Sequence, residues 1–492
     1  MDTEDICFAP ATTLASQIRS QSLSPVELIE AVLHRIERLE PRLNAMALLT
    51  AETALSQARA AECAVMEGGA LGALHGIPVT IKDHEAIAGL PTEFGSFTCK
   101  GDTPDFTTPM VTRLRDAGAI ILGKTTTPEF GWKGVSDGPL TGMTHNPWKH
   151  GYNAGASSSG AGVGAAAGYG PLHQAGDGAG SIRMPAHFCG AFGMKPSYGR
   201  VPIYPPSTGD NTLHLGPMTR SVADAALMLE TMAGPHTWDQ TSLEAAPAAY
   251  SQRLHETFPR PLRIAFSPDL GHARVDPEVA ALVRCAVQAL ESDLGLAVEE
   301  VTPAWGPSGP ELARFFWPAH FAARHAALLP QWEARMDPGF VACIRAGMNF
   351  TLADYQRMRQ WKYGYCVDIH RSFQDWDFLV TPAVSVAAFP ANQLQPAHWP
   401  QHAWDWLSWA EFSYPFNLSG NPAASIPCGF TPEGLPVGLQ IVGRRFDDLG
   451  VLQLAARFEA ARPWAQHRPP FPSEEARDDE CERLGFCDGR RR

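Results

Sequence analysis

Residues 151–185 read GYNAGASSSGAGVGAAAGYGPLHQAGDGAGSIRMP, and the rest of the chain is organised around them. The stretch holds a triple serine, Ser157 to Ser159, and a lone serine, Ser181, among small residues. Glycine and alanine bury little apolar area and cost backbone entropy, so this stretch cannot form a core by itself. It suits a site where backbone N–H groups and hydroxyls approach a reacting group closely. We therefore predict that it forms the catalytic floor of a serine hydrolase.

The composition is that of a globular chain with a sizeable core: of 492 residues, 45% are apolar and 18% are charged. A net charge of −13, with no basic run except the last three arginines, argues against nucleic acid or an anionic membrane as partner. Ten cysteines without a C-x-x-C pair argue against a zinc ribbon or a disulfide framework. The acidic N-terminus resembles no secretion signal, and no apolar run nears the ~18 residues of a membrane helix. We expect a soluble, cytoplasmic protein.

Short β-type runs alternate with amphipathic helices along most of the chain. Ser24 and Glu27 form a capping box with Pro25 at the first helical position. Further helices are expected over 51–66, 109–117, from 221 to about 232, from 276 to about 290, and from 351, the longest. Strands are expected over 79–81, 119–122, 262–266, 297–301, 378–380, 424–427 and 437–442. The alternation indicates an α/β fold, in which Lys82 follows the first strand, at a strand end where site residues often lie.

Three familiar motifs are absent or misplaced. Gly160, Gly162 and Ala165 fit the dinucleotide pattern G-x-G-x-x-A, but no apolar strand precedes them. Residues 134–138, GVSDG, fit the nucleophile elbow, but Pro139 stands where the following helix should begin, so we interpret them as a surface turn. No H-E-x-x-H occurs, which excludes the zincin route.

Ser181 lies among small residues whose N–H groups can converge on one point, as an oxyanion hole requires. A flexible glycine loop fits the same local composition equally well. The serine needs a base, because a free hydroxyl is a weak nucleophile at neutral pH, and none of the 17 histidines is marked out by its context. Lys82 ends an apolar run and can act as base if burial lowers its pKa. A solvated lysine is the more common outcome at a strand end.

Together these segments resemble the amidase signature enzymes. GIPVTIKD around Lys82 is similar to the family's catalytic-lysine strand, GASSSGAG around Ser157 to its GGSSGG segment, and DGAGSIRMPAHFCGAFGMKPSYGRVP to its nucleophile block. The three residues Lys82, Ser157 and Ser181 also fall at the family's intervals, 75 and then 24 residues. Further family-like blocks are LEPRLNAM, GAIILGKTTTPEFG, PMTRSVADAALML, DFLVTPA and NPAASIPCGFTPEGLPVGLQIVG. The resemblance covers most of 14–451 and is thin between about 234 and 375.

The resemblance implies one large α/β domain over 1–467, with a central mixed, many-stranded sheet covered by helices on both faces. A less family-like, helical and aromatic region at about 234–410 would lie on the substrate side. Residues 468–492 are expected to form a loosely ordered tail.

The resemblance also implies a catalytic triad: Ser181 attacks the carbonyl, Ser157 bridges, and neutral Lys82 is the base. Ser157 would follow a cis peptide bond from Ala156. The implied oxyanion-hole residues are Gly178, Ala179, Gly180 and Ser181, and the implied supporting residues are Ser158, which would support the lysine, and the pair Asp177 and Arg183. No metal or organic cofactor is implied.

Two positions depart from the family pattern. Ser159 stands where glycine is usual, so the register of the three serines rests on their spacing to Ser181. Ala179 replaces a common glycine of the oxyanion loop, which adds a methyl group but keeps the N–H donor.

The substrate is expected to be a small amide. The tryptophan-rich region beyond Trp305 suggests an apolar or aryl one, although ordinary core tryptophans explain that composition at least as well. The segments 132–143 and 204–211 and that aromatic region would set its identity, with Met143, Tyr204 and Trp409 as the named contacts. Alternatives remain: an ester, carbamate or urea hydrolase, the amidase-like component of a tRNA-dependent glutamine amidotransferase, or a catalytically silent binding protein. Neither nucleic acid nor membrane is expected as a partner, and a homodimer is one assembly that we consider.

Overall fold

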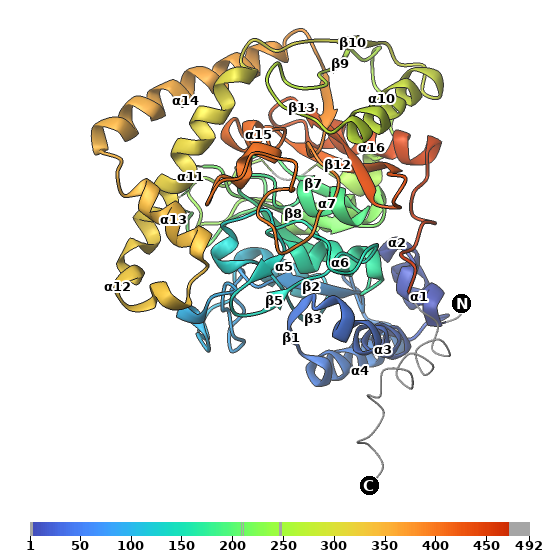
Figure 1. The fold of residues 1–492 in the computed structure, drawn as a ribbon. Helices are drawn as coiled ribbons and strands as arrows, with labels where there is room; N and C mark the ends of the chain where they lie inside the picture. Colours follow the sequence, from blue (N-terminus) through green and yellow to red (C-terminus); the bar gives the residue numbers. More distant parts are fainter. Residues whose placement is uncertain (1–2, 208, 210, 246–247, 472–492) are drawn as a thin grey trace.

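The computed structural model describes residues 3–207, 209, 211–245 and 248–471. Within that part of the chain, eleven strands form one mixed sheet (Figure 1). Four pairs are parallel, β2 with β3 and β6, and β9 with β10 and β11, and the other pairs are antiparallel. In spatial order the strands are β1 (Met46–Leu49), β3 (Ile120–Thr125), β2 (Pro78–Lys82), β6 (Leu172–Asp177), β8 (His214–Thr219), β7 (Phe192–Lys195), β12 (Ala423–Phe430), β13 (Pro436–Gly443), β11 (Phe378–Pro382), β9 (Ile264–Phe266) and β10 (Val298–Glu300). The predicted α/β class with a central mixed sheet is confirmed.

Helices surround this sheet (Figure 1). They are α1 (Thr3–Phe8), α2 (Ala11–Arg19), α3 (Pro25–Leu43), α4 (Ala51–Met66), α5 (Pro109–Asp116), α6 (Ser159–Ala167), α7 (Arg183–Cys189), α8 (Val222–Met232), α9 (Tyr250–Arg253), α10 (Pro277–Ser292), α11 (Gly309–His325), α12 (Leu329–Trp332), α13 (Pro338–Gly347), α14 (Leu352–Ser372), α15 (Tyr414–Leu418) and α16 (Asp448–Ala461). A short hairpin, β4 (Asp137–Gly138) and β5 (Gly142–Met143), stands apart from the large sheet.

Helix α3 begins as its sequence predicts. The side chain of Ser24 caps the first turn and that of Glu27 returns to the Ser24 backbone N–H at 3.0 Å, with Pro25 at the first helical position. Helix α14 begins with the same device, built from Thr351 and Asp354. Both capping boxes satisfy N–H groups that have no partner inside the helix.

Both faces of the sheet are buried, as the first three residues of β11 show. Phe378 and Val380 belong to the main hydrophobic core, whereas Leu379 between them packs into a second core with α11 and α14. Successive strand side chains point to opposite faces, so the two cores lie on opposite sides of the sheet. Helices α11 to α14 gather on one side of the molecule in Figure 1, away from α3 and α4.

The glycine-rich stretch contains a strand and two helices that we did not predict from the sequence: β6, α6 and α7. Every residue of α6 is buried. A Cβ atom at Gly160 would lie 2.0 Å from the Ala45 carbonyl oxygen, and one at Gly164 would lie 2.7 Å from the His173 ring. The small residues are therefore needed because α6 packs directly against backbone and ring atoms, leaving no room for side chains.

The interpretation of residues 134–138 as a surface turn is wrong, although they are indeed not a nucleophile elbow. Ser136 is buried, and its hydroxyl donates to the Thr144 carbonyl at 2.7 Å and accepts from the Ala154 N–H at 3.0 Å. Ser136 thus joins two buried loops and takes no part in the site.

The predicted tail over 468–492 falls mostly outside the described residues, which end at 471. The four residues that are described lie against the protein: Arg468 pairs with Asp5 at 3.0 Å, and Phe471 packs on the main core. No helix of the described part is long and apolar enough to cross a membrane.

Candidate active site

Lys82 ends β2, a strand whose five residues are all buried between β3 and β6. Its Nζ donates a hydrogen bond to Ser157 Oγ at 2.6 Å, and the residue is only 2% exposed. Burial lowers the pKa of Lys82 to about 7, although Glu85 and Asp177 act in the opposite direction. A lysine in this state is available as a base near neutral pH, since half of it is unprotonated there.

Ser157 follows a cis peptide bond from Ala156, as predicted. Its contact with Lys82 also fixes the register of the three serines: the first of them faces the lysine. The hydroxyl of Ser159 is buried and has no hydrogen-bond partner among the described residues.

Ser158 holds the two serine segments together through the backbone. Its hydroxyl donates to the Gly176 carbonyl at 3.1 Å and accepts from the Gly176 N–H at 3.2 Å, and its own N–H donates to the Ser181 carbonyl at 3.3 Å. The expectation that Ser158 supports the lysine by a hydrogen bond is therefore corrected. This side chain braces the end of β6 instead.

Asp177 and Arg183 form a fully buried ion pair at 3.0 Å, at the two ends of the Ser181 loop. Burial by itself would raise the pKa of Asp177, but the Arg183 guanidinium holds that pKa well below its usual range. Arg183 also donates to the Ser413 carbonyl and to the side chains of Gln440 and Asn417, at 2.9, 2.8 and 2.6 Å. The pair therefore fastens the loop to α15 and β13.

Two N–H groups of the loop are taken up by the Asp177 carboxylate: those of Gly180, at 2.6 Å, and Ile182, at 3.1 Å. Among the described residues, no hydrogen bond engages the N–H groups of Gly178, Ala179 or Ser181. Of the four donors that we predicted, Gly180 is thus committed to the loop itself. The N–H groups of the other three make no hydrogen bond among the described residues.

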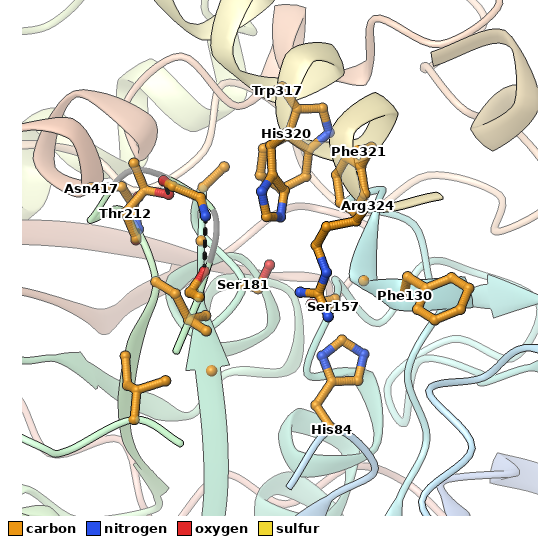
Figure 2. A pocket seen from close by; sticks show the side chains of 18 of the residues that line it. His84, Phe130, Ser157, Ser181, Thr212, Trp317, His320, Phe321, Arg324 and Asn417 are labelled. Atoms are coloured by element: carbon orange, nitrogen blue, oxygen red, sulfur yellow. Dashed lines mark hydrogen bonds between the residues drawn. The ribbon is translucent and has the colours of Figure 1, made fainter. Parts of the chain in front are cut away.

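A cavity of about 200 Å³ opens above Lys82, Ser157 and Ser181, as Figure 2 shows for the two serines. Its walls are largely apolar and aromatic, and the tips of several polar side chains enter it. The aromatic side chains of the lining are Phe94, Phe130, Tyr204, Phe316, Trp317, Phe321 and Tyr414. The charged or imidazole-bearing ones, besides Lys82, are His84, Glu85, His320 and Arg324.

Tyr204 lies in this lining, but the predictions for Met143 and Trp409 are wrong. Trp409 is fully buried behind the cavity, where it packs against Phe188 and donates to the Leu394 carbonyl at 3.0 Å. Met143 lies in the small β4–β5 hairpin, where its carbonyl accepts from the side chain of Asn44.

Helix α11 lies in the aromatic region beyond Trp305 that we expected to set the substrate, and it supplies a face of the cavity whose residues we did not name (Figure 2). Its lining residues are Ala313, Phe316, Trp317, His320, Phe321 and Arg324. They recur at intervals of three and four, the spacing of one helical face. This periodicity was the available signal, but without the fold it cannot be distinguished from an ordinary core-facing stripe.

Comparison with known proteins identifies the family. A family model described as Amidase matches residues 27–452. An acylamidase of Rhodococcus erythropolis is 40% identical over 480 residues, which cover 95% of this chain and 98% of that protein. The chain belongs to the amidase signature family. The family model and the acylamidase likeness together make it an amidase, a hydrolase of C–N bonds other than peptide bonds.

Further relatives match it over most of its length. A bacterial aryl acylamidase of this family superposes with a TM-score of 0.86 at 27% identity, covering 93% of this chain and 97% of that one. A 6-aminohexanoate cyclic dimer hydrolase, solved with its substrate, gives a TM-score of 0.86 at 29% identity, covering 94% and 99%. A glutamyl-tRNA(Gln) amidotransferase component of Picosynechococcus sp. is 32% identical over 485 residues, covering 93% of this chain and 99% of that protein.

Proposed function

We propose that this amidase hydrolyses small aryl or apolar amides through an acyl-enzyme on Ser181, with Ser157 and Lys82 relaying the proton. The observation that carries the proposal is the 2.6 Å contact between Lys82 Nζ and Ser157 Oγ at the floor of the aromatic cavity that Ser181 also lines. Neutral Lys82 takes the Ser157 proton, Ser157 takes that of Ser181, and Ser181 Oγ forms a bond to the substrate carbonyl carbon.

The second half of the cycle returns the proton. The tetrahedral intermediate collapses as the C–N bond breaks, and the leaving nitrogen receives the proton that Lys82 holds, by way of Ser157. Water then attacks the acyl-enzyme and gives one proton back to the same relay, which releases the acid and restores the Ser181 hydroxyl.

Oxyanion stabilisation is assigned to the N–H groups of Gly178, Ala179 and Ser181. The basis is that no hydrogen bond among the described residues uses them, while the Gly180 N–H donates to Asp177. Each preorganised donor of this kind contributes about 3 kcal/mol to transition-state stabilisation. The Ala179 methyl group lines the cavity and narrows the space available to substrate.

The substrate class follows from the lining. Rings of Phe130, Trp317 and Phe321 offer apolar contact area that a small polar amide cannot use. The 40% identical acylamidase and the aryl acylamidase of the same fold support an aryl or apolar acyl amide as substrate.

The test is a panel of anilides, aliphatic primary amides, esters, carbamates and ureas, assayed with purified enzyme and with Ser181→Ala. We expect anilides to have the highest kcat/KM and Ser181→Ala to be inactive on all of them. A clear preference for an ester, carbamate or urea would move the assignment to that reaction class on the same residues.

The amidotransferase alternative has one supporting observation, the 32% identity to a glutamyl-tRNA(Gln) amidotransferase component. Glutamine is small and polar, however, whereas the cavity lining is largely apolar and aromatic. Purified chain that releases ammonia from glutamine but leaves anilides intact would establish this alternative.

Three finer predictions are kept as proposals: one structural domain over 1–467, a homodimer, and a cytoplasmic location. The single sheet that spans β1 to β13 supports the first. A single cooperative thermal transition, a dimer mass in sedimentation equilibrium, and fractionation of the native host would test them in turn.

A further inference from the structure

Arg324 is a cation that the described part of the protein leaves unpaired inside the substrate cavity. It stands on α11, and its side chain reaches down into the space above His84 and Ser157 (Figure 2). Among the described residues its guanidinium takes part in no hydrogen bond, ion pair or ring contact. By contrast, Arg314 on the same helix pairs with Asp405 at 2.6 Å. A guanidinium presents five donors in a planar fork that matches a carboxylate, so its open position is a binding opportunity.

The lining offers no strong competitor for this cation. Glu85 is its only carboxyl group among the described residues. Glu85 is buried, burial raises its pKa to about 7, and it forms no ion pair with Arg324. The arginine charge is felt by His84 instead: after burial, Lys82 and Arg324 are among the causes that lower the pKa of His84 well below its usual value. Arg324 therefore remains a cation on this side of the cavity without a paired carboxylate among the described residues.

Gly131 ties this side to the proton relay. A Cβ atom at Gly131 would lie 2.8 Å from both His84 Cε1 and Ser157 Oγ, so the two side chains face the same glycine. In the proposed mechanism Ser157 passes the proton to the leaving nitrogen. The amine portion of the substrate must then extend toward Ser157, His84 and Arg324, beside the ring of Phe130 (Figure 2).

We infer that Arg324 selects substrates whose amine portion carries an anion, namely acylated aromatic amines with a carboxylate on the ring. The carboxylate pairs with the guanidinium while the ring lies against the aromatic wall. This assignment rests on the proposed function, because it uses the leaving-group side of the Ser157 relay. A basic residue in the last turn also stabilises a helix through the helix dipole. That accounts for a positive charge at Arg324 but not for a side chain that reaches into the cavity.

The experiment compares matched substrates and matched variants. The anionic probes are 3- and 4-acetamidobenzoate, and each is paired with the neutral acetamidophenyl methyl ketone of the same shape. N-Phenylsuccinamate carries its carboxylate on the acyl side, and acetanilide has none. The variants are Arg324→Gln, Arg324→Lys and, as control, Arg345→Gln, which removes an exposed last-turn arginine of α13.

We expect wild-type enzyme to favour at least one acid over its ketone by about ten-fold or more in kcat/KM, mainly through KM. Arg324→Gln should bring the ratio of acid to ketone close to one, and Arg324→Lys should keep part of the preference for the acid. Added salt should reduce the ratio in the wild type, and Arg345→Gln should leave it unchanged.

Two results would overturn the assignment to Arg324: equal kcat/KM for acids and ketones in the wild type, or a ratio that survives Arg324→Gln. If the wild type still hydrolysed acetanilide, the proposed function would stand. An Arg324-dependent preference confined to N-phenylsuccinamate would refute the leaving-group placement. If the wild-type enzyme hydrolysed no anilide at all, the proposed function itself would be refuted.

Discussion

Lys82 and Ser157 are 75 residues apart in the chain, and their Nζ and Oγ atoms lie 2.6 Å apart in a buried contact. The lysine comes from the end of a strand and the serine from the loop before a helix of small residues. The proposed proton relay depends on this contact between distant segments, so substituting its residues is the first test of the relay.

Removing any of the three side chains should stop or severely reduce turnover without unfolding the protein. We expect Ser181→Ala and Lys82→Ala to lower kcat by more than about a thousand-fold, and Ser157→Ala to lower it severely but less completely. Activity on acetanilide and near-ultraviolet circular dichroism measure the two effects separately. Near-full activity of Lys82→Ala across neutral pH would contradict the relay.

The pH dependence of kcat/KM should report Lys82. Because burial lowers its pKa to about 7, the base is protonated and inactive below that pH and neutral above it. The rate should therefore rise by about a decade per pH unit on the acid side and level off above pH 7. A profile that rises only near the pKa of an exposed lysine would show that the base is not desolvated.

Glu85→Gln tests the same pH profile by removing a charge that acts on Lys82. The Glu85 carboxylate is one of the charges that raise the pKa of Lys82 against the effect of burial. Removing it should move the midpoint to lower pH. A midpoint that moved to higher pH would have the wrong sign for a lysine base.

Gly131→Ala should impair catalysis by crowding Ser157. Gly131 has φ +67°, and its Cβ would lie 2.8 Å from Ser157 Oγ. Misplacing a reacting group by ~1 Å can lower the rate by about a hundred-fold. The control is Gly151→Ala, at φ +83° with no atom within 4 Å of the new Cβ.

Both alanines adopt the same strained backbone region, so each should lower the free energy of unfolding by about 1–2 kcal/mol. Only Gly131→Ala should lower kcat substantially. Equal activity of the two variants would mean that Ser157 can shift without consequence.

Arg183→Met should destabilise the fold strongly. It leaves the Asp177 carboxylate buried without its cation and also removes donors to Ser413, Gln440 and Asn417. Breaking a buried pair from one side costs about 3–5 kcal/mol, measurable by urea unfolding. The control, Arg253→Met, breaks an exposed pair with Glu256 and should cost less than about 1 kcal/mol. Similar losses in both variants would contradict a structural role for the buried pair.

Local signals in the sequence predicted much of the framework correctly. The capping box at Ser24, the helix start at 351 and the apolar runs at 79–81 and 437–442 depend on neighbours within a few residues, and the structure confirms them. The segment from 159 to 219 was not predicted in the same way. Its helix α6 has no apolar stripe, because every one of its faces is buried and its side chains are small.

The substrate cavity was predicted only in part, because its walls come from separate elements. Tyr204 was identified, whereas Trp409 is a tryptophan of the same aromatic region that turns into the core. Composition gives the number of aromatic rings, but the helix rotation and the packing of α11 decide which of them face the cavity. Arg324 is likewise an ordinary last-turn arginine until its neighbours are placed.

The sequence by itself determined the family, the identity of the three candidate catalytic residues and the α/β class, because these depend on residue types at fixed intervals. Only the tertiary structure decided that Ser157 is the serine facing Lys82 and that the Gly180 N–H donates to the Asp177 carboxylate. It also decided that α11 forms a wall of the cavity. Those facts depend on how strands and helices far apart in the chain meet, and burial, which lowers the pKa of Lys82 toward neutrality, exists only once they have met.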